Sequence, residues 1–289
     1  MQRKPVEFTS ADETIVGELY LPDGEVTNAP AIVLCHGFAG VKELLLPAFA
    51  EYFASAGFVA LAFDYRGFGG SGGEPGRLVP ALQVEDIRNA VSFVSGLDEV
   101  DAGRIGLWGT SFGGANAIVT AAEDDRVKAL SVQLTFADGE RVITSAMSEE
   151  EKAKFLAMIE KMEQKKQATG KEMMVPIVKV LSDEQSRAFY DEYAGQFDAL
   201  NIKIPFLTVA ETLKLKPINA LPDVKVPILV VAATDDSVNP VSESHALFEA
   251  ANEPKELLEL AGATHYEVYK GKPFEQVAAR QVEWFRTYL

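Results

Sequence analysis

The stretch that most constrains the fold is Gly109-Thr-Ser-Phe-Gly113, which joins two apolar segments of different character. Residues 104–108 are typical of a short buried strand, and residues 115–122 continue as an apolar helix. Ser111 therefore lies where a strand turns sharply into a helix. Such a turn strains the backbone of the serine, and Gly109 and Gly113 lack the side chains that would collide there. We expect the Ser111 hydroxyl to project above the edge of a sheet.

The composition limits the fold and the partners that the chain can have. The 289 residues are 47% hydrophobic, which is enough for one well-filled core or for one domain with a large insertion. The formal net charge of −16 argues against nucleic acid or an anionic membrane as partner, since both need clusters of Lys and Arg. No apolar stretch before Asp12 reaches the length that a signal peptide needs, and no apolar segment is long enough to span a bilayer. One cysteine, Cys35, excludes an internal disulfide, so we expect a cytoplasmic protein.

Strand-like and helix-like segments alternate along most of the chain. An antiparallel hairpin is predicted at residues 6–21. The apolar runs 31–35 and 58–63 then enclose a helix, and the order strand, helix, strand predicts parallel neighbours. The alternation predicts an α/β sheet with helices on both faces. The further segments that continue it are 80–97, 104–108, 115–122, 127–135, 226–233, 242–252, 255–260 and 274–289.

Residues 137–222 interrupt this alternation. They contain no buried strand, and a segment of this length is not expected as a loop in a compact domain. Capping boxes at Ser148 and Ser182 begin amphipathic helices within it. We therefore predict a helical cap over 137–222, inserted after the sixth strand of a core domain made of residues 1–136 and 223–289.

Five of the six methionines lie in this predicted cap. Their flexible side chains could line a surface that repacks around different ligands, or they could fill gaps in the core of a small helical unit. A cap in this position would hang over Ser111. We expect Met158 and Met162, together with Trp108, to contribute to a substrate pocket.

A serine hydroxyl becomes a good nucleophile only when a neighbouring base takes its proton, and the chain offers three histidines. His265 lies in a loop between the last predicted strand and the final helix. His36 ends a predicted strand and His245 sits on a predicted helix, so structural or surface roles are expected for both. His265 is the predicted base.

The base in turn needs a carboxylate that fixes its tautomer and stabilises its charged form. Asp235 and Asp236 directly follow a predicted strand upstream of His265. Asp138, at the start of the predicted cap, is a third candidate. Residue types and spacing alone do not decide which of these three carboxylates pairs with His265.

These stretches together resemble the α/β-hydrolase superfamily over nearly the whole chain. Within it, the chain is similar to bacterial serine hydrolases near the dienelactone-hydrolase and X-Pro-peptidase branches. Dienelactone hydrolases use cysteine where this chain has Ser111 and lack so large a cap, so their substrate is not expected here. Dehalogenases and epoxide hydrolases use Asp at that position, which excludes them. The matching stretches follow the order of the superfamily: His36–Gly40, Asp64–Gly72, Gly109–Gly113, the loop with Asp236, and Gly262–His265.

The resemblance selects one carboxylate and implies the oxyanion donors. The superfamily's frame around its acid fits residues 233–240 with Asp236 as the acid, and Asp235 stays the alternative. One oxyanion donor in this family is the N–H that follows the nucleophile, which here belongs to Phe112. The other comes from the loop after the strand that ends at His36, where Phe38 occupies the matching position.

We therefore predict a serine hydrolase that cleaves carboxylic esters of hydrophobic substrates through an acyl-enzyme, without cofactor or metal. Amide or carbon–carbon bond hydrolysis and acyl transfer use the same residues and stay open. A non-catalytic ligand receptor on the same scaffold is the alternative from another class. The glycine-rich stretch 69–76 lacks the Gly-Lys-Ser/Thr ending of a phosphate loop, and no His, Cys and carboxylate cluster has metal-ligand spacing. The sequence does not indicate an oligomeric state.

Overall fold

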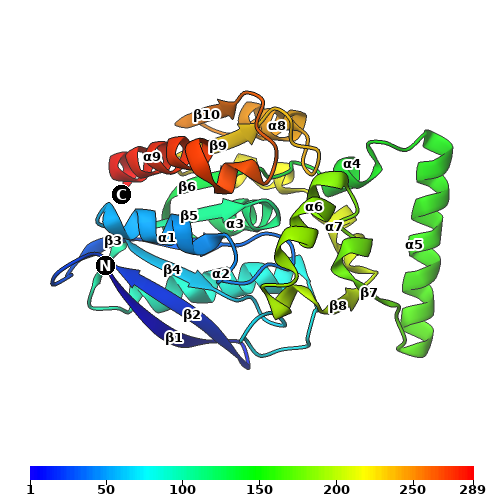
Figure 1. The fold of residues 1–289 in the computed structure, drawn as a ribbon, viewed down its shortest axis with the longest axis horizontal. Coiled ribbons are helices and arrows are strands. Elements are labelled where there is room, and N and C mark those ends of the chain that lie inside the picture. The colour runs from blue at the N-terminus through cyan, green and yellow to red at the C-terminus, as the bar shows by residue number, and fades with distance from the viewer.

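A sheet of eight strands is the scaffold of the molecule. The strands are β1 (Gln2–Ser10), β2 (Glu13–Leu21), β3 (Ala29–Cys35), β4 (Val59–Phe63), β5 (Val100–Thr110), β6 (Val127–Gln133), β9 (Ile228–Ala233) and β10 (Lys255–Leu260). The computed structural model describes residues 1–289 and orders these strands β1-β2-β4-β3-β5-β6-β9-β10 (Figure 1). β2 pairs antiparallel with β1 and β4, and every pair from β4 to β10 is parallel. The predicted, mostly parallel α/β sheet is confirmed.

Helices cover both faces of this sheet. They are α1 (Leu46–Ser55), α2 (Pro80–Ser95), α3 (Phe112–Glu123), α8 (Val241–Ala250) and α9 (Gly271–Tyr288). Every residue of β4 and β9 is buried, because strands covered on two sides have no polar face. Neighbouring residues of β3 point to opposite faces of the sheet. Val33 packs in the core that includes α2, α3 and α8, and Leu34 packs in the core that includes α1 and α9. No helix of the structure combines the length and apolarity needed to cross a bilayer.

The Trp108 side chain lies inside the layer formed with α1 and α9. It is fully buried, its ring centroid is 4.7 Å from that of Phe49, and its indole N–H donates to Gln281 Oε1 at 2.9 Å. The prediction that Trp108 lines a substrate pocket is therefore wrong. Strand alternation is the reason, because it turns this side chain into the core beneath a face of the sheet, whereas Ser111 follows the end of β5.

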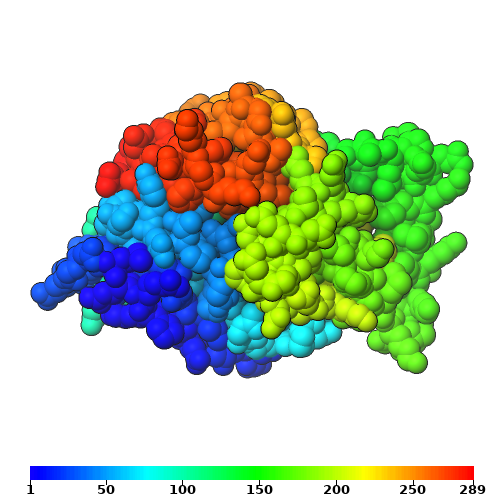
Figure 2. All heavy atoms as spheres, in the orientation of Figure 1, coloured from blue at the N-terminus to red at the C-terminus, as the bar shows by residue number.

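The segment between β6 and β9, here called the insertion, lies beyond the carboxyl ends of the parallel strands and forms the green to yellow end of the molecule (Figures 1 and 2). Its elements are α4 (Gly139–Thr144), α5 (Glu149–Thr169), β7 (Met174–Pro176), η1 (Ile177–Lys179), α6 (Glu184–Tyr193), η2 (Asp198–Leu200), β8 (Lys203–Pro205), α7 (Thr208–Lys214), η3 (Pro217–Asn219) and η4 (Leu221–Asp223). β7 and β8 form a small antiparallel sheet that the sequence analysis did not predict. Figure 1 shows α5 farthest from the main sheet, with α6 and α7 between them.

Both helices predicted from capping boxes are present in the insertion. Ser148 caps α5 with the two reciprocal hydrogen bonds of a capping box, and Gly170 ends the helix at a φ of 67°. The cap of α6 is Asp183 and not Ser182, because the Asp183 carboxylate accepts the N–H of Ser186 at 2.8 Å. The one-residue shift leaves the following glutamine free for a contact outside the helix.

Candidate active site

Ser111 is the single residue between β5 and α3 and has a φ of 52° and a ψ of −123°. The flanking glycines are required by packing. A Cβ at position 113 would lie 2.2 Å from the carbonyl oxygen of Cys35, and one at position 109 would lie 2.7 Å from the carbonyl oxygen of Gly113. A serine kept in a left-handed conformation by such close packing is a strained residue of the kind that clusters at functional sites.

His265 and Asp236 form a buried pair beside this turn. His265 Nδ1 lies 2.7 Å from Asp236 Oδ2, and the two side chains are almost completely shielded from solvent. The second carboxylate oxygen, Oδ1, accepts the backbone N–H groups of Val238 and Asn239, each at 2.8 Å. Because both oxygens are held, the carboxylate can orient the imidazole through its Nδ1–H and leave Nε2 as the reacting nitrogen.

The other carboxylates considered from the sequence lie elsewhere. The Asp235 side chain is exposed and accepts the hydroxyl of the neighbouring Thr234 at 3.0 Å. Asp138 caps α4 and forms an ion pair of 3.3 Å with Lys216. Neither contacts His265, so the structure brings Asp236 alone to the histidine.

The Ser111 hydroxyl makes its side-chain hydrogen bond with Asn239, whose Nδ2 lies 3.4 Å from Oγ. The same Nδ2 donates to the carbonyl of Leu134 at 2.7 Å, which holds the amide in place. Ser111 and His265 line one cavity but are not hydrogen-bonded to each other. A shared cavity is compatible with a nucleophile and its base, because catalytic hydrogen bonds are often long in the resting protein and tighten during the reaction. The sequence analysis missed Asn239, which follows the acid by three residues.

The two residues that carry the predicted oxyanion donors belong to segments that adjoin Ser111. Phe112 is the first residue of α3, so its N–H has no acceptor within the helix. Phe38 follows Gly37, where a Cβ would lie only 3.2 Å from the Ser111 Cβ. The rings of Phe38 and Phe112 meet edge to face with centroids 5.7 Å apart. This packing brings the loop after β3 against the start of α3 at the serine.

The other two histidines, His36 and His245, make hydrogen bonds with other residues. His36 is buried, its Nδ1 contacts the Gly37 carbonyl at 3.0 Å, and its Nε2 accepts the N–H of Tyr65 at 3.5 Å. Burial lowers the pKa of His36, which favours the neutral ring. His245 lies on the exposed side of α8, 2.6 Å from Glu259. No group of three or more His, Cys, Asp or Glu side chains in the structure is placed to hold a metal ion.

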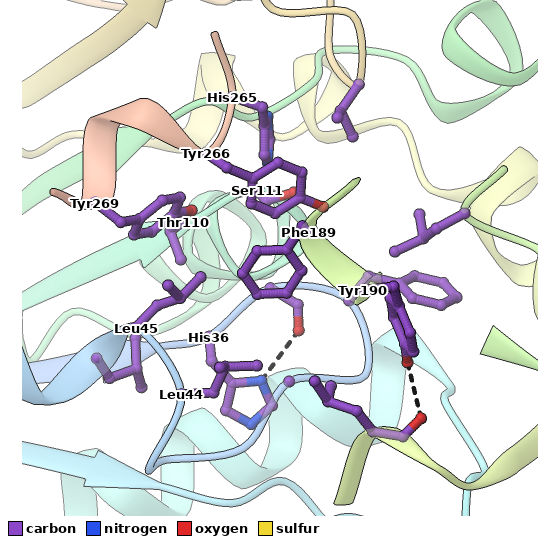
Figure 3. A pocket seen from close by; sticks show the side chains of 17 residues that line it. His36, Leu44, Leu45, Thr110, Ser111, Phe189, Tyr190, His265, Tyr266 and Tyr269 are labelled. Carbon is purple, nitrogen blue, oxygen red and sulfur yellow. Dashed lines mark hydrogen bonds between the residues drawn. The ribbon is translucent and has the colours of Figure 1, made fainter. Parts of the chain in front are cut away.

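A contact missed at the sequence level joins α6 to the loops that carry the acid and the base. Gln185 Nε2 donates to the carbonyl of Asp235 at 2.7 Å, and Gln185 Oε1 accepts the N–H of His265 at 3.0 Å. The ring of Phe189, one turn further along α6, stacks on Tyr266 with centroids 4.3 Å apart (Figure 3). The insertion is thereby tied directly to both loops. In the sequence, the sign of this contact was Gln185, the last residue of the apparent capping box that begins at Ser182.

Two cavities reach Ser111. The smaller has a volume of about 70 Å³ and is lined by both Ser111 and His265 (Figure 3). The larger has a volume of about 480 Å³ and extends from Ser111 and Phe112 into the insertion. Four residues line both, namely Phe38, Ser111, Leu181 and Val238. The insertion contributes mainly apolar side chains to the two cavities, among them Val142, Ile143, Met147 and Phe155 in the larger, and Phe189, Tyr190 and Leu200 in the smaller.

Met158 and Met162 line neither cavity, so their predicted place in the pocket is wrong. Met158 is 41% exposed, and Met162 packs against a small core that joins α5 to α7. Both follow Phe155 on α5, and Phe155 does line the larger cavity. The apolar side of α5 packs mainly against residues 207–213, which directs Met162 away from the cavities.

Comparison with known proteins gives a consistent result. A family model described as alpha/beta hydrolase fold matches residues 30–271. An uncharacterized 31.7 kDa protein of the traX-finO intergenic region of Escherichia coli is 49% identical over 93% of this chain and 94% of its own. The quorum-quenching protein AidA of Acinetobacter baumannii is 31% identical over 97% of this chain and 93% of its own. The acyltransferase drtE of Aspergillus calidoustus has the same identity over 97% of this chain and 93% of its own.

The structural comparison extends over the full chain. The structure of DcsB in complex with its substrate analogue superposes with a TM-score of 0.87 at 28% identity and covers 100% of both chains. The similarity therefore includes the insertion as well as the sheet.

Proposed function

Because the chain belongs to the alpha/beta hydrolase family, we propose that it cleaves carboxylic esters of hydrophobic substrates through an acyl-enzyme on Ser111. The observation that carries this proposal is the buried pair of His265 and Asp236, in which His265 lines a cavity together with a strained serine. We also propose that residues 137–222 serve as a cap over this site.

The first half of the reaction forms the acyl-enzyme. Ser111 Oγ attacks the ester carbonyl carbon while its proton passes to His265 Nε2, and Asp236 stabilises the imidazolium through Nδ1. The carbonyl oxygen becomes an oxyanion that accepts the N–H groups of Phe38 and Phe112. When the tetrahedral intermediate collapses, the bond to the alcohol oxygen breaks and His265 gives its proton to that oxygen.

The second half reverses these roles. A water molecule loses a proton to His265 Nε2 and attacks the acyl carbon, and the oxyanion forms again between the same two N–H groups. Collapse releases the carboxylic acid, and the proton on His265 returns to Ser111 Oγ. Every proton that moves in the two half-reactions passes through His265 Nε2.

Acyl transfer is the second candidate, and the 31% identity to a protein named an acyltransferase favours it. It needs the same acyl-enzyme, which an alcohol then attacks in place of water. A product analysis with added alcohols separates the two reactions, because hydrolysis gives the free acid and transfer gives a new ester.

The proposal is tested by incubating the protein with a fluorophosphonate and measuring the intact mass. We expect one adduct per chain on the wild type and none on Ser111→Ala, together with turnover of p-nitrophenyl esters by the wild type only. An unlabelled wild-type protein would contradict the proposal and favour a ligand receptor on the same scaffold. Labelling without ester turnover would restrict the proposal to amide, carbon–carbon or transfer chemistry.

A further inference from the structure

The two cavities that meet at Ser111 differ in size and in the catalytic groups that line them. His265 lines only the cavity of about 70 Å³, whereas Phe112 and Asn239 line only the cavity of about 480 Å³. An ester bound at Ser111 has an acyl side and an alcohol side. The different linings determine which side enters which cavity.

The proton carried by His265 places the alcohol side. His265 must protonate the departing oxygen, so that oxygen has to lie within hydrogen-bond reach of the imidazole. The alcohol group then occupies space that His265 lines, which is the smaller cavity. The attacking water of the second half-reaction needs the same position, since it gives its proton to the same nitrogen.

The acyl chain extends in the direction that the other three substituents of the tetrahedral carbon leave free. The tetrahedral carbon carries the Ser111 oxygen, the oxyanion between the N–H groups of Phe38 and Phe112, the leaving oxygen near His265, and the acyl chain. The larger cavity opens from Ser111 and Phe112 on the side that His265 does not line. Thirteen of its 21 lining residues are hydrophobic, so it suits an apolar chain.

The volumes set the size of each group. A cavity of roughly 150 Å³ holds a benzene molecule, whereas one water needs only about 10–15 Å³ on this measure. The larger cavity, at about 480 Å³, therefore has room for an acyl chain of medium length, and the smaller, at about 70 Å³, for a few waters or a short alcohol.

We infer that the enzyme is selective for an extended apolar acyl group joined to a small leaving group, with the acyl chain in the larger cavity and the leaving group beside His265. This inference rests on the proposed function and specifies its substrate class. It also implies that bulky alcohols are poor acceptors for the acyl group.

The test uses two isomeric esters, methyl octanoate and heptyl acetate, which have the same atoms and closely similar hydrophobicity. They differ in whether the long chain is on the acyl or the alcohol side. We expect kcat/KM, measured by titrating the released acid, to be at least about tenfold higher for methyl octanoate, because burying two methylenes already gives a factor of this order.

Variants in the lining of the two cavities show where the acyl chain binds. Val142, half-buried on α4, lines the larger cavity, and Val142→Phe should lower the ratio of kcat/KM for methyl octanoate to that for methyl propanoate by about tenfold. Met158→Phe adds a ring to the neighbouring α5 outside both cavities and should leave this ratio unchanged. Leu200→Ala enlarges the smaller cavity and should raise the rate on heptyl acetate relative to methyl acetate.

Equal or faster cleavage of heptyl acetate would overturn the inference while leaving the proposed function in place, since an ester would still be hydrolysed. A Val142→Phe profile identical to that of Met158→Phe would also overturn it. Cleavage of neither isomer would overturn it as well. Fluorophosphonate labelling of Ser111 then shows whether the proposed function fails too, because a protein without that adduct has no reactive serine.

Discussion

At the residue scale, the proposed chemistry depends on three side chains held by unequal means. Ser111 is placed by backbone strain and by Asn239, whereas His265 and Asp236 hold each other within a buried pair. Each contributes only if the other two are in place, because the proton removed from the serine must be accepted and the resulting charge stabilised. Their contributions to the rate are therefore not independent.

This dependence predicts the outcome of a double mutant. Ser111→Ala and His265→Ala should each lower kcat on an ester by a factor on the order of 10⁴ or more, and the double mutant should lose little beyond either single change. Circular dichroism and denaturant unfolding confirm that each variant is folded. If the two losses multiply in the double mutant, the residues act separately and the assignment is wrong.

The two neighbouring aspartates allow a matched comparison. Asp236→Asn should lower kcat by a factor of about 10⁴, because the amide turns an N–H group toward Nδ1 and leaves the proton on the Nε2 that must accept one from Ser111. Asp235→Asn, which changes an exposed side chain, should alter kcat by less than about threefold. Steady-state kinetics on one ester at fixed pH decide between them. A severe effect at position 235 and a mild one at 236 would move the acid by one residue.

At the element scale, α6 links the insertion to the loops that carry Asp236 and His265. Its glutamine bonds to both the loop after β9 and the loop after β10, and its Phe189 stacks on Tyr266. Burial raises the pKa of Tyr266, so its hydroxyl stays neutral and can pair with Ser186 at 3.1 Å. Since α6 also lines the smaller cavity, any displacement of this helix would change pocket and base together.

We therefore expect Gln185→Ala to act on the reaction step rather than on binding. Loss of two hydrogen bonds to the loops should lower kcat by about tenfold while KM changes by less than about threefold, because the imidazole is held less well. Gln196→Ala is the control, since the Gln196 side chain donates only to Glu192 one turn earlier in the same segment. A wild-type kcat for Gln185→Ala, with both variants folded, would show that α6 does not position His265.

At the scale of the whole molecule, one buried group should link stability to pH. His36 lines the smaller cavity, with Lys42, Glu43 and Asp64 nearby. Burial lowers its pKa below the ordinary value of 6.5, because this effect outweighs those of the Gly37 carbonyl and the two carboxylates, which raise it. The unfolded chain takes up this proton near 6.5, whereas the folded chain resists it until a lower pH. The contribution of His36 to stability is therefore complete above 6.5 and is lost as pH falls below it.

His36→Asn removes this titration while keeping a donor near the Gly37 carbonyl. Between about pH 7.5 and pH 5.5 the free energy of unfolding of the wild type should fall more than that of the variant, by at most about 1.4 kcal/mol, the limit set by titration of the unfolded chain near 6.5. Urea unfolding at the two pH values measures the difference, and the other two histidines contribute equally to both proteins. Identical pH slopes would show that His36 titrates alike in the folded and unfolded chain.

The sequence was sufficient for the features that local patterns encode. The alternating strands and helices, the strained serine between two glycines, and the start of α5 at Ser148 depend on periodicity or on neighbouring residues, and the fold class is confirmed. The order of the motifs also selected Ser111, His265 and Asp236, which the structure brings together. The domain boundaries at residues 137 and 222 and the catalytic roles stay predictions.

The tertiary structure decided what depends on the direction of side chains and on the placement of the insertion. Asp235 and Asp236 are adjacent in sequence, yet only Asp236 faces His265. The choice of Trp108, Met158 and Met162 for the pocket failed, because strand alternation and helix packing turn them elsewhere, and Gln185 and Asn239 were missed. Each of these contacts joins segments far apart along the chain, so no local pattern contains it. The two unequal cavities at Ser111 arise for the same reason, from the way the insertion packs over the ends of the strands.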